Sequence, residues 1–263
     1  MKHLKVLNTN QLKYIALIFM TLDSAFFALP GLPSWIHLIT RFVAPLFAYL
    51  TIEGFFHTRN RKRHLRRLWS AAILMQLGDF LSFFLLGKEH TISDNIFLTL
   101  AVGYSVLYFW QKARDKDGKT STNIILGTLI FLIGLALSFG GLPLGQHFSL
   151  TLEGGIQILF LMLIFWGFYD SPTKQLIIFG LWSIPLLIFW GPDLNIGYYK
   201  SFSVWFDMFC YNSDALSFLF LPFLLFYNGQ KGSNKPIHKW FFYIFYPAHL
   251  WILHLIALFL SLK

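Results

Sequence analysis

The residue of this sequence best suited to move a proton is His249, which lies deep in an apolar segment near the C-terminus. Imidazole titrates near neutral pH and can act as a general base, and Tyr246, three residues earlier, shares its helix face. Counted from residue 240, His249 lies about nine residues, or roughly 14 Å, along a helix. That depth is near the middle of a hydrocarbon layer about 30 Å thick, so the imidazole needs a partner, a water-filled cavity or a function.

A neighbouring proline gives His249 a simpler role. Pro247 has no N–H, so the carbonyl of Tyr243 is left without its helical donor and the helix is expected to kink. A structural histidine would hydrogen-bond to that freed carbonyl. Spacing alone favours this structural role over a proton-handling pair with Tyr246.

Two opposite charges lie at similar depth in the first two apolar segments. Asp23 and Arg41 are joined by a short connection, and a lone buried charge of either sign is costly, so the sequence predicts that they pair. His37 lies four residues before Arg41, on the same helix face. Two readings are open: a structural ion pair, with His37 at the interface, or a charge-lined cavity open to the outer face.

Polar residues also lie near the opposite, inner ends of the apolar segments. Tyr49, Glu53 and His57 recur at a spacing of four, and Arg59 opens a basic stretch. The segment 228–239 combines glycines with three lysines, which suits the phosphates of a nucleotide-like molecule. The tendency of lysine and arginine to gather at the cytoplasmic side of a membrane explains the same lysines without any ligand.

The composition requires a membrane to position these residues. The chain has 263 residues, of which 56% are hydrophobic and 13% charged, and apolar runs of about 18 or more residues recur along it. We expect an all-α polytopic transmembrane helical bundle, folded as one membrane domain over residues 1–263, with an uncleaved first span. About nine spans are predicted, at residues 12–30, 35–57, 68–87, 93–110, 122–140, 150–169, 174–191, 208–227 and 240–261.

The basic residues predict the orientation of these spans. With the N-terminus inside, seventeen of the 21 lysines and arginines fall in segments on the inner side. The prediction is therefore an inside N-terminus and an outside C-terminus. The net charge of +9 is explained by these inner segments rather than by nucleic-acid binding.

Several other kinds of site find no support in the sequence. Cys210 is the sole cysteine, which excludes an internal disulfide and any cysteine-based metal centre. We predict no metal site, and no segment resembles a P-loop, a zinc motif or a Ser-His-Asp set.

Four segments resemble the TraX family, membrane proteins typified by the conjugal-transfer pilin acetylase. The resemblance covers most of the chain, although residues 105–215 match in hydropathy only. The segments are LKYIALIFMTLD (12–23), RFVAPLFAYLTIEGFFHTRN (41–60), DNIFLTLAVG (94–103) and FYNGQKG…KWFFYIFYPAHLWILHL (226–255). Family positions matched here are Asp23, Arg41, Glu53, His57, Asn95, Asn228, Tyr246, Pro247 and His249.

The resemblance implies transfer of an acyl group, generally acetyl, from a cytoplasmic coenzyme A thioester to an amine or hydroxyl. The protein is then expected in a bacterial cytoplasmic membrane, among membrane lipids, with a peptide, glycan or lipid acceptor and no nucleic acid. One position departs from the family: Ser24 follows Asp23 where the family usually has histidine. If that histidine is the general base, His37 or His249 substitutes for it; otherwise the chain is a non-acylating relative.

These observations predict an integral membrane acyltransferase that needs no covalent intermediate, because a thioester is already activated. His249 is the expected base and His37 the second choice, with Tyr246 beside the base and Arg41, held by Asp23, orienting the oxyanion or the acceptor. The residues expected to receive acetyl-CoA or another acyl-CoA are Asn228, Gly229, Lys231, Arg59, His57 and Glu53.

Two other functions use the same residues. A transporter or flippase would use the buried charges as a substrate or proton path, although no internal repeat is evident. A non-catalytic membrane scaffold or immunity-type partner would be consistent with the serine at position 24.

Overall fold

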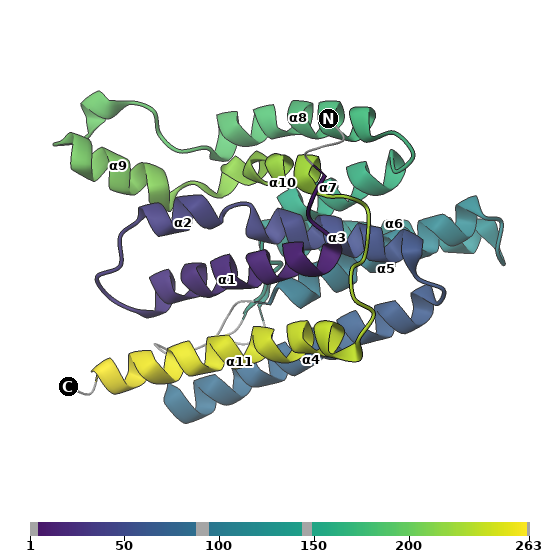
Figure 1. The fold of residues 1–263 in the computed structure, drawn as a ribbon, viewed down its shortest axis with the longest axis horizontal. Coiled ribbons are helices and arrows are strands. Elements are labelled where there is room, and N and C mark those ends of the chain that lie inside the picture. Colours follow the sequence, from purple (N-terminus) through teal and green to yellow (C-terminus); the bar gives the residue numbers. More distant parts are fainter. Residues whose placement is uncertain (1–4, 88–94, 144–148, 262–263) are drawn as a thin grey trace. The chain divides into compact units, whose positions relative to one another are not determined.

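The computed structural model describes residues 5–87, 95–143 and 149–261 and is almost entirely helical (Figure 1). Two two-residue strands, β1 (Leu142–Pro143) and β2 (Ser149–Leu150), form a short antiparallel pair. The α-helices are α1 (Thr9–Ala28), α2 (Trp35–Thr40), α3 (Val43–His57), α4 (Arg61–Leu86), α5 (Ile96–Arg114), α6 (Thr120–Phe139), α7 (Gly155–Gly167), α8 (Pro172–Trp190), α9 (Phe202–Tyr211), α10 (Leu221–Phe226) and α11 (Pro236–Ser261). Two 3₁₀ helices, η3 (Ile196–Tyr198) and η4 (Asp214–Phe220), lie on either side of α9.

The chain divides into two compact units. Unit 1 comprises Met1–Phe47 and Leu176–Lys263, and unit 2 comprises Ala48–Gln175. Unit 1 therefore contains α1, α2, α9, η4, α10 and α11, which carry most of the residues singled out in the sequence.

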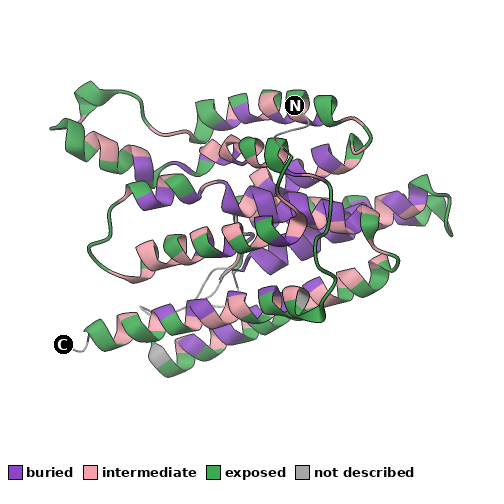
Figure 2. Cartoon of the chain, viewed as in Figure 1, coloured by how far each residue is buried: buried purple, intermediate pink, exposed green. Residues whose placement is uncertain are grey.

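Unit 2 is built around α5. Fourteen of the residues of this helix are buried, among them Tyr104 and Phe97, where it packs against α4, α6 and α7 (Figure 2). Asn95 caps its N-terminus by accepting from the N–H of Leu98 and donates its side-chain amide to the carbonyl of Ala72 in α4. Gly103 lets α5 approach α7, since a Cβ there would lie 2.5 Å from the sulfur of Met162.

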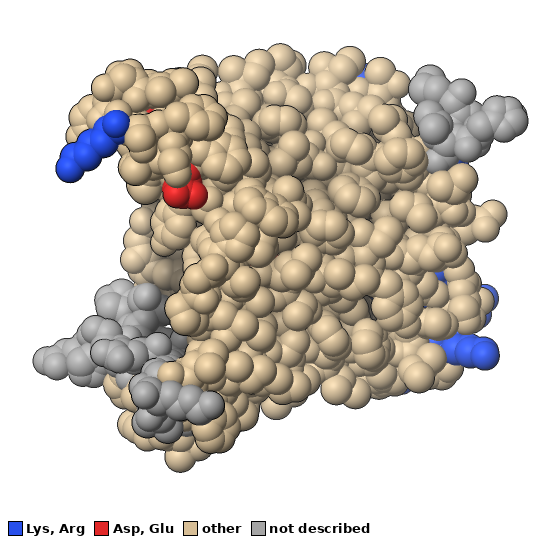
Figure 3. Space-filling view, turned by 60° about the vertical axis from the view of Figure 1, so that its left-hand side comes forward, with Lys and Arg blue, Asp and Glu red and all other residues tan. Residues whose placement is uncertain are grey.

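Many large apolar side chains face outward, as expected in lipid. Phe84, Ile188 and Leu74 are between 68% and 76% exposed. The face shown in Figure 3 is almost wholly uncharged, with Lys and Arg only at its edges. Because water would penalise this much exposed apolar surface, the long apolar helices indicate a multi-pass membrane protein.

The described helices provide fewer candidate spans than the nine expected. Six are long and apolar enough to cross a membrane: α1, α2 with α3, α4, α6, α8 and α11. The 71° bent pair of α9 and η4–α10 would make a seventh. Of the two other predicted spans, 93–110 corresponds to the buried α5, and 150–169 corresponds to α7, whose 13 residues reach only about 20 Å.

A loop of unit 1 holds the starts of α1 and α11 together. The N–H of Leu7 donates to the carbonyl of Phe226, the N–H of Asn228 donates back to the carbonyl of Leu7, and Thr9 donates to Gln230. These bonds form a parallel bridge, so the two helices start side by side and run in the same direction (Figure 1). This register decides which residues of α1 and α11 meet further along.

The glycines of that loop provide a test of this junction. Gly229 and Gly232 both have positive φ, at 75° and 81°, but only at Gly232 would a Cβ collide with another group, lying 2.7 Å from Oδ1 of Asn8. Asn8 caps α1 in a capping box with Gln11. Gly229→Ala should cost about 1 kcal/mol for the left-handed backbone, and Gly232→Ala a further 0.5–2 kcal/mol, roughly the value of a lost cap. The melting temperature in detergent should therefore fall more for Gly232→Ala, and an equal fall would contradict this account of the loop.

Candidate active site

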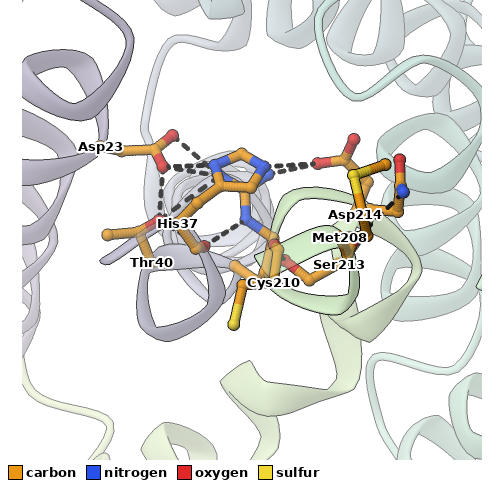
Figure 4. A network of polar contacts seen from close by, with 9 residues as sticks. Asp23, His37, Thr40, Met208, Cys210, Ser213 and Asp214 are labelled. Atoms are coloured by element: carbon orange, nitrogen blue, oxygen red, sulfur yellow. Dashed lines mark hydrogen bonds and ion pairs between the residues drawn. The ribbon is translucent and has the colours of Figure 1, made fainter. Parts of the chain in front are cut away.

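The carboxylate of Asp23 is the centre of a polar network in unit 1 (Figure 4). It lies in the last turns of α1 and accepts from three side chains: Nη2 of Arg41 at 2.7 and 2.8 Å, Nδ1 of His37 at 2.9 Å, and the hydroxyl of Thr40. The ion pair predicted between Asp23 and Arg41 is thus confirmed. Its partners all come from α2 or its C-cap, so the network fixes α2 against the end of α1.

Arg41 lies at a break in the second predicted span rather than within a continuous helix. It is the C-cap of α2, and α3 begins at Val43. Its Nε donates to the carbonyl of His37 at 2.8 Å, and its Nη1 is bonded to Asp214 of η4. The guanidinium therefore ties together α1, α2 and η4 with its planar set of donors.

His37 is almost fully buried and lies on the same side of α2 as Arg41, as its spacing predicts. Its side chain is only 4% exposed, and its ring stacks on Phe26 and meets Phe27 edge to face. Its Nδ1 lies 2.8 Å from Nη2 of Arg41 as well as 2.9 Å from Asp23. That nitrogen donates to the carboxylate when protonated and accepts from the guanidinium when not, so His37 has two available tautomers.

His249 is paired with Ser24, the residue that follows Asp23. Its Nδ1 lies 3.1 Å from the carbonyl of Phe245 and its Nε2 lies 3.2 Å from the Ser24 hydroxyl. A carbonyl can only accept, so Nδ1 carries the proton of the neutral ring and Nε2 is left to accept from the serine. The imidazole is buried, with 5% exposure, and the serine is half-buried.

Two sequence-based expectations about His249 are corrected. Its carbonyl partner belongs to Phe245, not to the Tyr243 carbonyl freed by Pro247, because the side chain turns back by one helical turn. It also lies further along its helix than the nine residues expected: α11 begins at Pro236, so His249 is 13 residues, or about 20 Å, along it. The parallel register with α1 then brings it level with Ser24.

Tyr246 contacts His249 through its ring. The two ring centroids are 5.7 Å apart and nearly perpendicular, and Tyr246 is 2% exposed. Both nitrogens of the imidazole are bonded to Ser24 and Phe245 as described above. Tyr246 therefore helps to orient the ring through this edge-to-face contact.

The expected donor-binding residues fall into two groups, one in each unit. In unit 1, the side chain of Asn228 accepts from the N–H of Gln230 and Lys231 donates to Asn234, so both take part in the turn that contains Gly229. In unit 2, Nε2 of His57 lies 3.7 Å from Glu53 and 3.1 Å from the hydroxyl of Tyr169.

Arg59, the remaining expected donor-binding residue, is exposed in the connection between α3 and α4. Among the described residues, no group of three or more His, Cys, Asp and Glu side chains could hold a metal ion.

Unit 2 also has an open cavity that the sequence did not indicate. It has a volume of about 430 Å³ and is lined by Trp110, Ala113, Arg114, Ile124, Thr128 and Trp166. The Arg114 guanidinium lies over the Trp166 ring, 5.9 Å from its centroid. Its lining combines indole faces with one cation at the C-terminal end of α5.

Three residues of the unit 1 network had no assigned role in the sequence: Ser24, Thr40 and Asp214. Ser24 was noted only as a departure from the family, and Asp214, in the predicted span 208–227, was not singled out. The sequence feature that could have identified Asp214 is its charge within an apolar stretch. A carboxylate there is costly unless a cation pairs with it. Thr40 gave no signal, since threonine is common in membrane helices.

Comparison with known proteins identifies the family. A family model described as TraX protein matches residues 8–257, across both units. The chain is 29% identical over 263 residues to the probable fimbrial assembly protein FimC, serogroup H1, of Dichelobacter nodosus, covering 95% of this chain and 96% of the relative. No solved structure matches. With a family model that spans nearly its whole length, the chain belongs to the TraX family.

Proposed function

We propose that the protein is an integral membrane acyltransferase that moves an acetyl or other short acyl group from cytoplasmic acyl-CoA to an amine or hydroxyl of an envelope component. The observation that carries the proposal is the buried His249 imidazole, whose unprotonated Nε2 faces a hydroxyl one residue from the Asp23–Arg41 pair. Together these groups supply a base and a fixed cation, the two requirements of acyl transfer from an activated thioester.

In this proposal His249 removes the proton of the attacking group. A neutral imidazole with its proton on Nδ1 can accept at Nε2, and the Phe245 carbonyl stabilises the imidazolium that results. His37 is the second candidate, since its Nδ1 donates to Asp23 in one tautomer and accepts from Arg41 in the other. Its contact with Asp23 makes it better suited to holding the network.

Arg41 is proposed to stabilise the oxyanion. Asp23, His37 and Asp214 fix its side chain in place, so it does not have to reorganise when charge develops on the substrate. Among the described residues, Nη1 is bonded to Asp214 alone, and an arginine Nη carries two hydrogens. One Nη1 hydrogen therefore remains to receive the oxyanion or to orient the acceptor.

The donor is proposed to enter from the inner ends of α1 and α11. Lys231, Gly229 and Asn228 lie in the turn at this end of unit 1. The Lys231 charge and the turn backbone suit the phosphates of coenzyme A. The acyl end would then extend along α1 by roughly 20 Å, the helical distance from the loop to His249.

The acceptor is proposed to be a peptide, with a fimbrial subunit as the first candidate to test. The support is the name of the relative, a fimbrial assembly protein that matches over nearly the full length of both chains. A glycan or a lipid head group has the same amine or hydroxyl chemistry and serves as the comparison in the test.

The base assignment is tested by His249→Gln, which keeps the size of the side chain but removes the titrating ring. Membranes containing the protein, given radiolabelled acetyl-CoA and an envelope fraction, should transfer label to that fraction. The variant should lose transfer by about 100-fold or more, the usual contribution of a general base. His238→Gln is the control, because His238 is in the same helix but bonds to Tyr14 near its start. Equal activity of His249→Gln and wild type would remove His249 as the base.

The membrane topology is proposed to have an inside N-terminus, with nine crossings and an outside C-terminus, on the strength of the lysine and arginine bias. Of the two predicted spans that are not among the candidate spans, α5 and α7, the 13 residues of α7 are shorter than a typical span. The connections near Lys119 and Lys200 are separated by α6, α7 and α8.

Reporter fusions at these two connections test the count. Alkaline phosphatase, which is active only outside the cytoplasm, should be inactive when fused after Lys119 and active when fused after Lys200. If the phosphatase is active at both positions, or inactive at both, α7 does not cross the membrane, and the prediction of nine crossings is wrong.

A further inference from the structure

We infer that Ser24 is a nucleophile that carries the acyl group as a serine ester between donor and acceptor. The inference rests on the proposed acyltransferase function and changes its mechanism from direct transfer to two successive displacements. It is drawn from the contacts of Ser24 and His249 and from the position of both beside the Asp23–Arg41 pair.

The first argument is the direction of the Ser24 hydroxyl. A serine or threonine within a helix commonly bonds to the carbonyl one turn earlier, as Thr21 does to Leu17 and Ser183 does to Phe179. The hydrogen bond that the structure gives to Ser24 instead runs to Nε2 of His249, 225 residues away in sequence. The hydroxyl is thus directed at a base rather than at its own helix.

The second argument is the order of the hydrogen bonds. The Phe245 carbonyl fixes the proton of His249 on Nδ1, the ring presents the Nε2 lone pair, and the Ser24 hydroxyl donates to it. This is the arrangement that activates a serine nucleophile, with a backbone carbonyl in place of the usual carboxylate as the group that orients the base.

The third argument is accessibility. The base is buried, with 5% exposure, while Ser24 is half-buried and so remains partly open to a substrate. Asp23, the preceding residue, holds the Arg41 cation at this level of α1. A hydroxyl with a buried base behind it and a fixed cation nearby is suited to attack a carbonyl carbon.

The two steps balance in atoms and protons. Oγ of Ser24 attacks the thioester carbonyl carbon, its proton passes to Nε2 of His249, and the carbon–sulfur bond breaks as that proton is delivered to the leaving sulfur of coenzyme A. The acceptor amine or hydroxyl then attacks the serine ester and loses its proton to Nε2, which returns it to Oγ as the ester bond breaks.

An exchange assay tests the inference without an acceptor. The purified protein in lipid vesicles is given unlabelled acetyl-CoA and tritiated coenzyme A. A serine ester allows label to enter acetyl-CoA, whereas direct transfer does not. Wild type should exchange and Ser24→Ala should lose exchange by about 100-fold or more. Ser183→Ala, which removes a buried hydroxyl of unit 1 that bonds to a carbonyl of its own helix, should exchange at the wild-type rate.

A second variant keeps the inference testable if Ser24→Ala does not fold. Ser24→Cys should accept acetyl as a thioester, which neutral hydroxylamine releases, whereas the wild-type ester should need alkaline hydroxylamine. Mass spectrometry should place the acetyl group on the peptide that contains residue 24. Acetyl found on a different peptide, or no acetyl on either wild type or Ser24→Cys, would overturn the inference.

The assay separates this inference from the proposed function. If wild type or Ser24→Ala transfers acetyl to an envelope fraction while wild type shows no exchange, transfer is direct, and only the serine intermediate is overturned. If wild type shows neither exchange nor transfer to that fraction, the acyltransferase function falls as well.

Discussion

The site depends on the charge of Asp23 being matched inside a segment that lipid surrounds. Lipid cannot solvate a carboxylate, and removing one partner of a buried ion pair typically costs about 3–5 kcal/mol. Arg41 meets that cost with two contacts to the carboxylate, and it does so from a break in the helix where its side chain can also reach Asp214. One guanidinium, through two ion pairs, thereby fixes the end of α1, the short helix α2 and the start of η4.

The second constraint is the parallel register of α1 and α11. The backbone bonds between Leu7 and the loop at Phe226 and Asn228 start the two helices together, and regular helical rise carries the alignment to the level of Ser24 and His249. Loop and ion pair act at opposite ends of α1: the loop determines the height at which the two residues meet, and the network holds the far end of the helix. This is why a turn rich in glycine bears on residues about 20 Å away along the helix.

The sequence was sufficient where one strong energetic rule applied. The cost of buried charge predicted the pairing of Asp23 with Arg41, helical spacing placed His37 beside Arg41, and hydropathy predicted the helical segments. It was insufficient where the answer depended on register between distant segments. The partner of His249 could not be predicted, because it follows from the start of α11 at Pro236 and from bonds to residues more than 200 positions away. The burial of α5 and α7 within the protein could not be predicted either, since hydropathy does not distinguish a helix buried in protein from one that faces lipid.

The central claim is that Arg41 and Asp23 hold α1 so that the unprotonated Nε2 of His249 receives the Ser24 hydroxyl. Nitrogen NMR of ¹⁵N-histidine-labelled protein, with the His249 signals assigned by their loss in His249→Gln, measures this directly. The account predicts a neutral ring with its proton on Nδ1 and an Nε2 resonance shifted by a hydrogen bond, which weakens in Arg41→Lys because lysine lacks the planar fork. A proton on Nε2 in the wild-type protein, or an Nε2 resonance unaffected by Arg41→Lys, would contradict it.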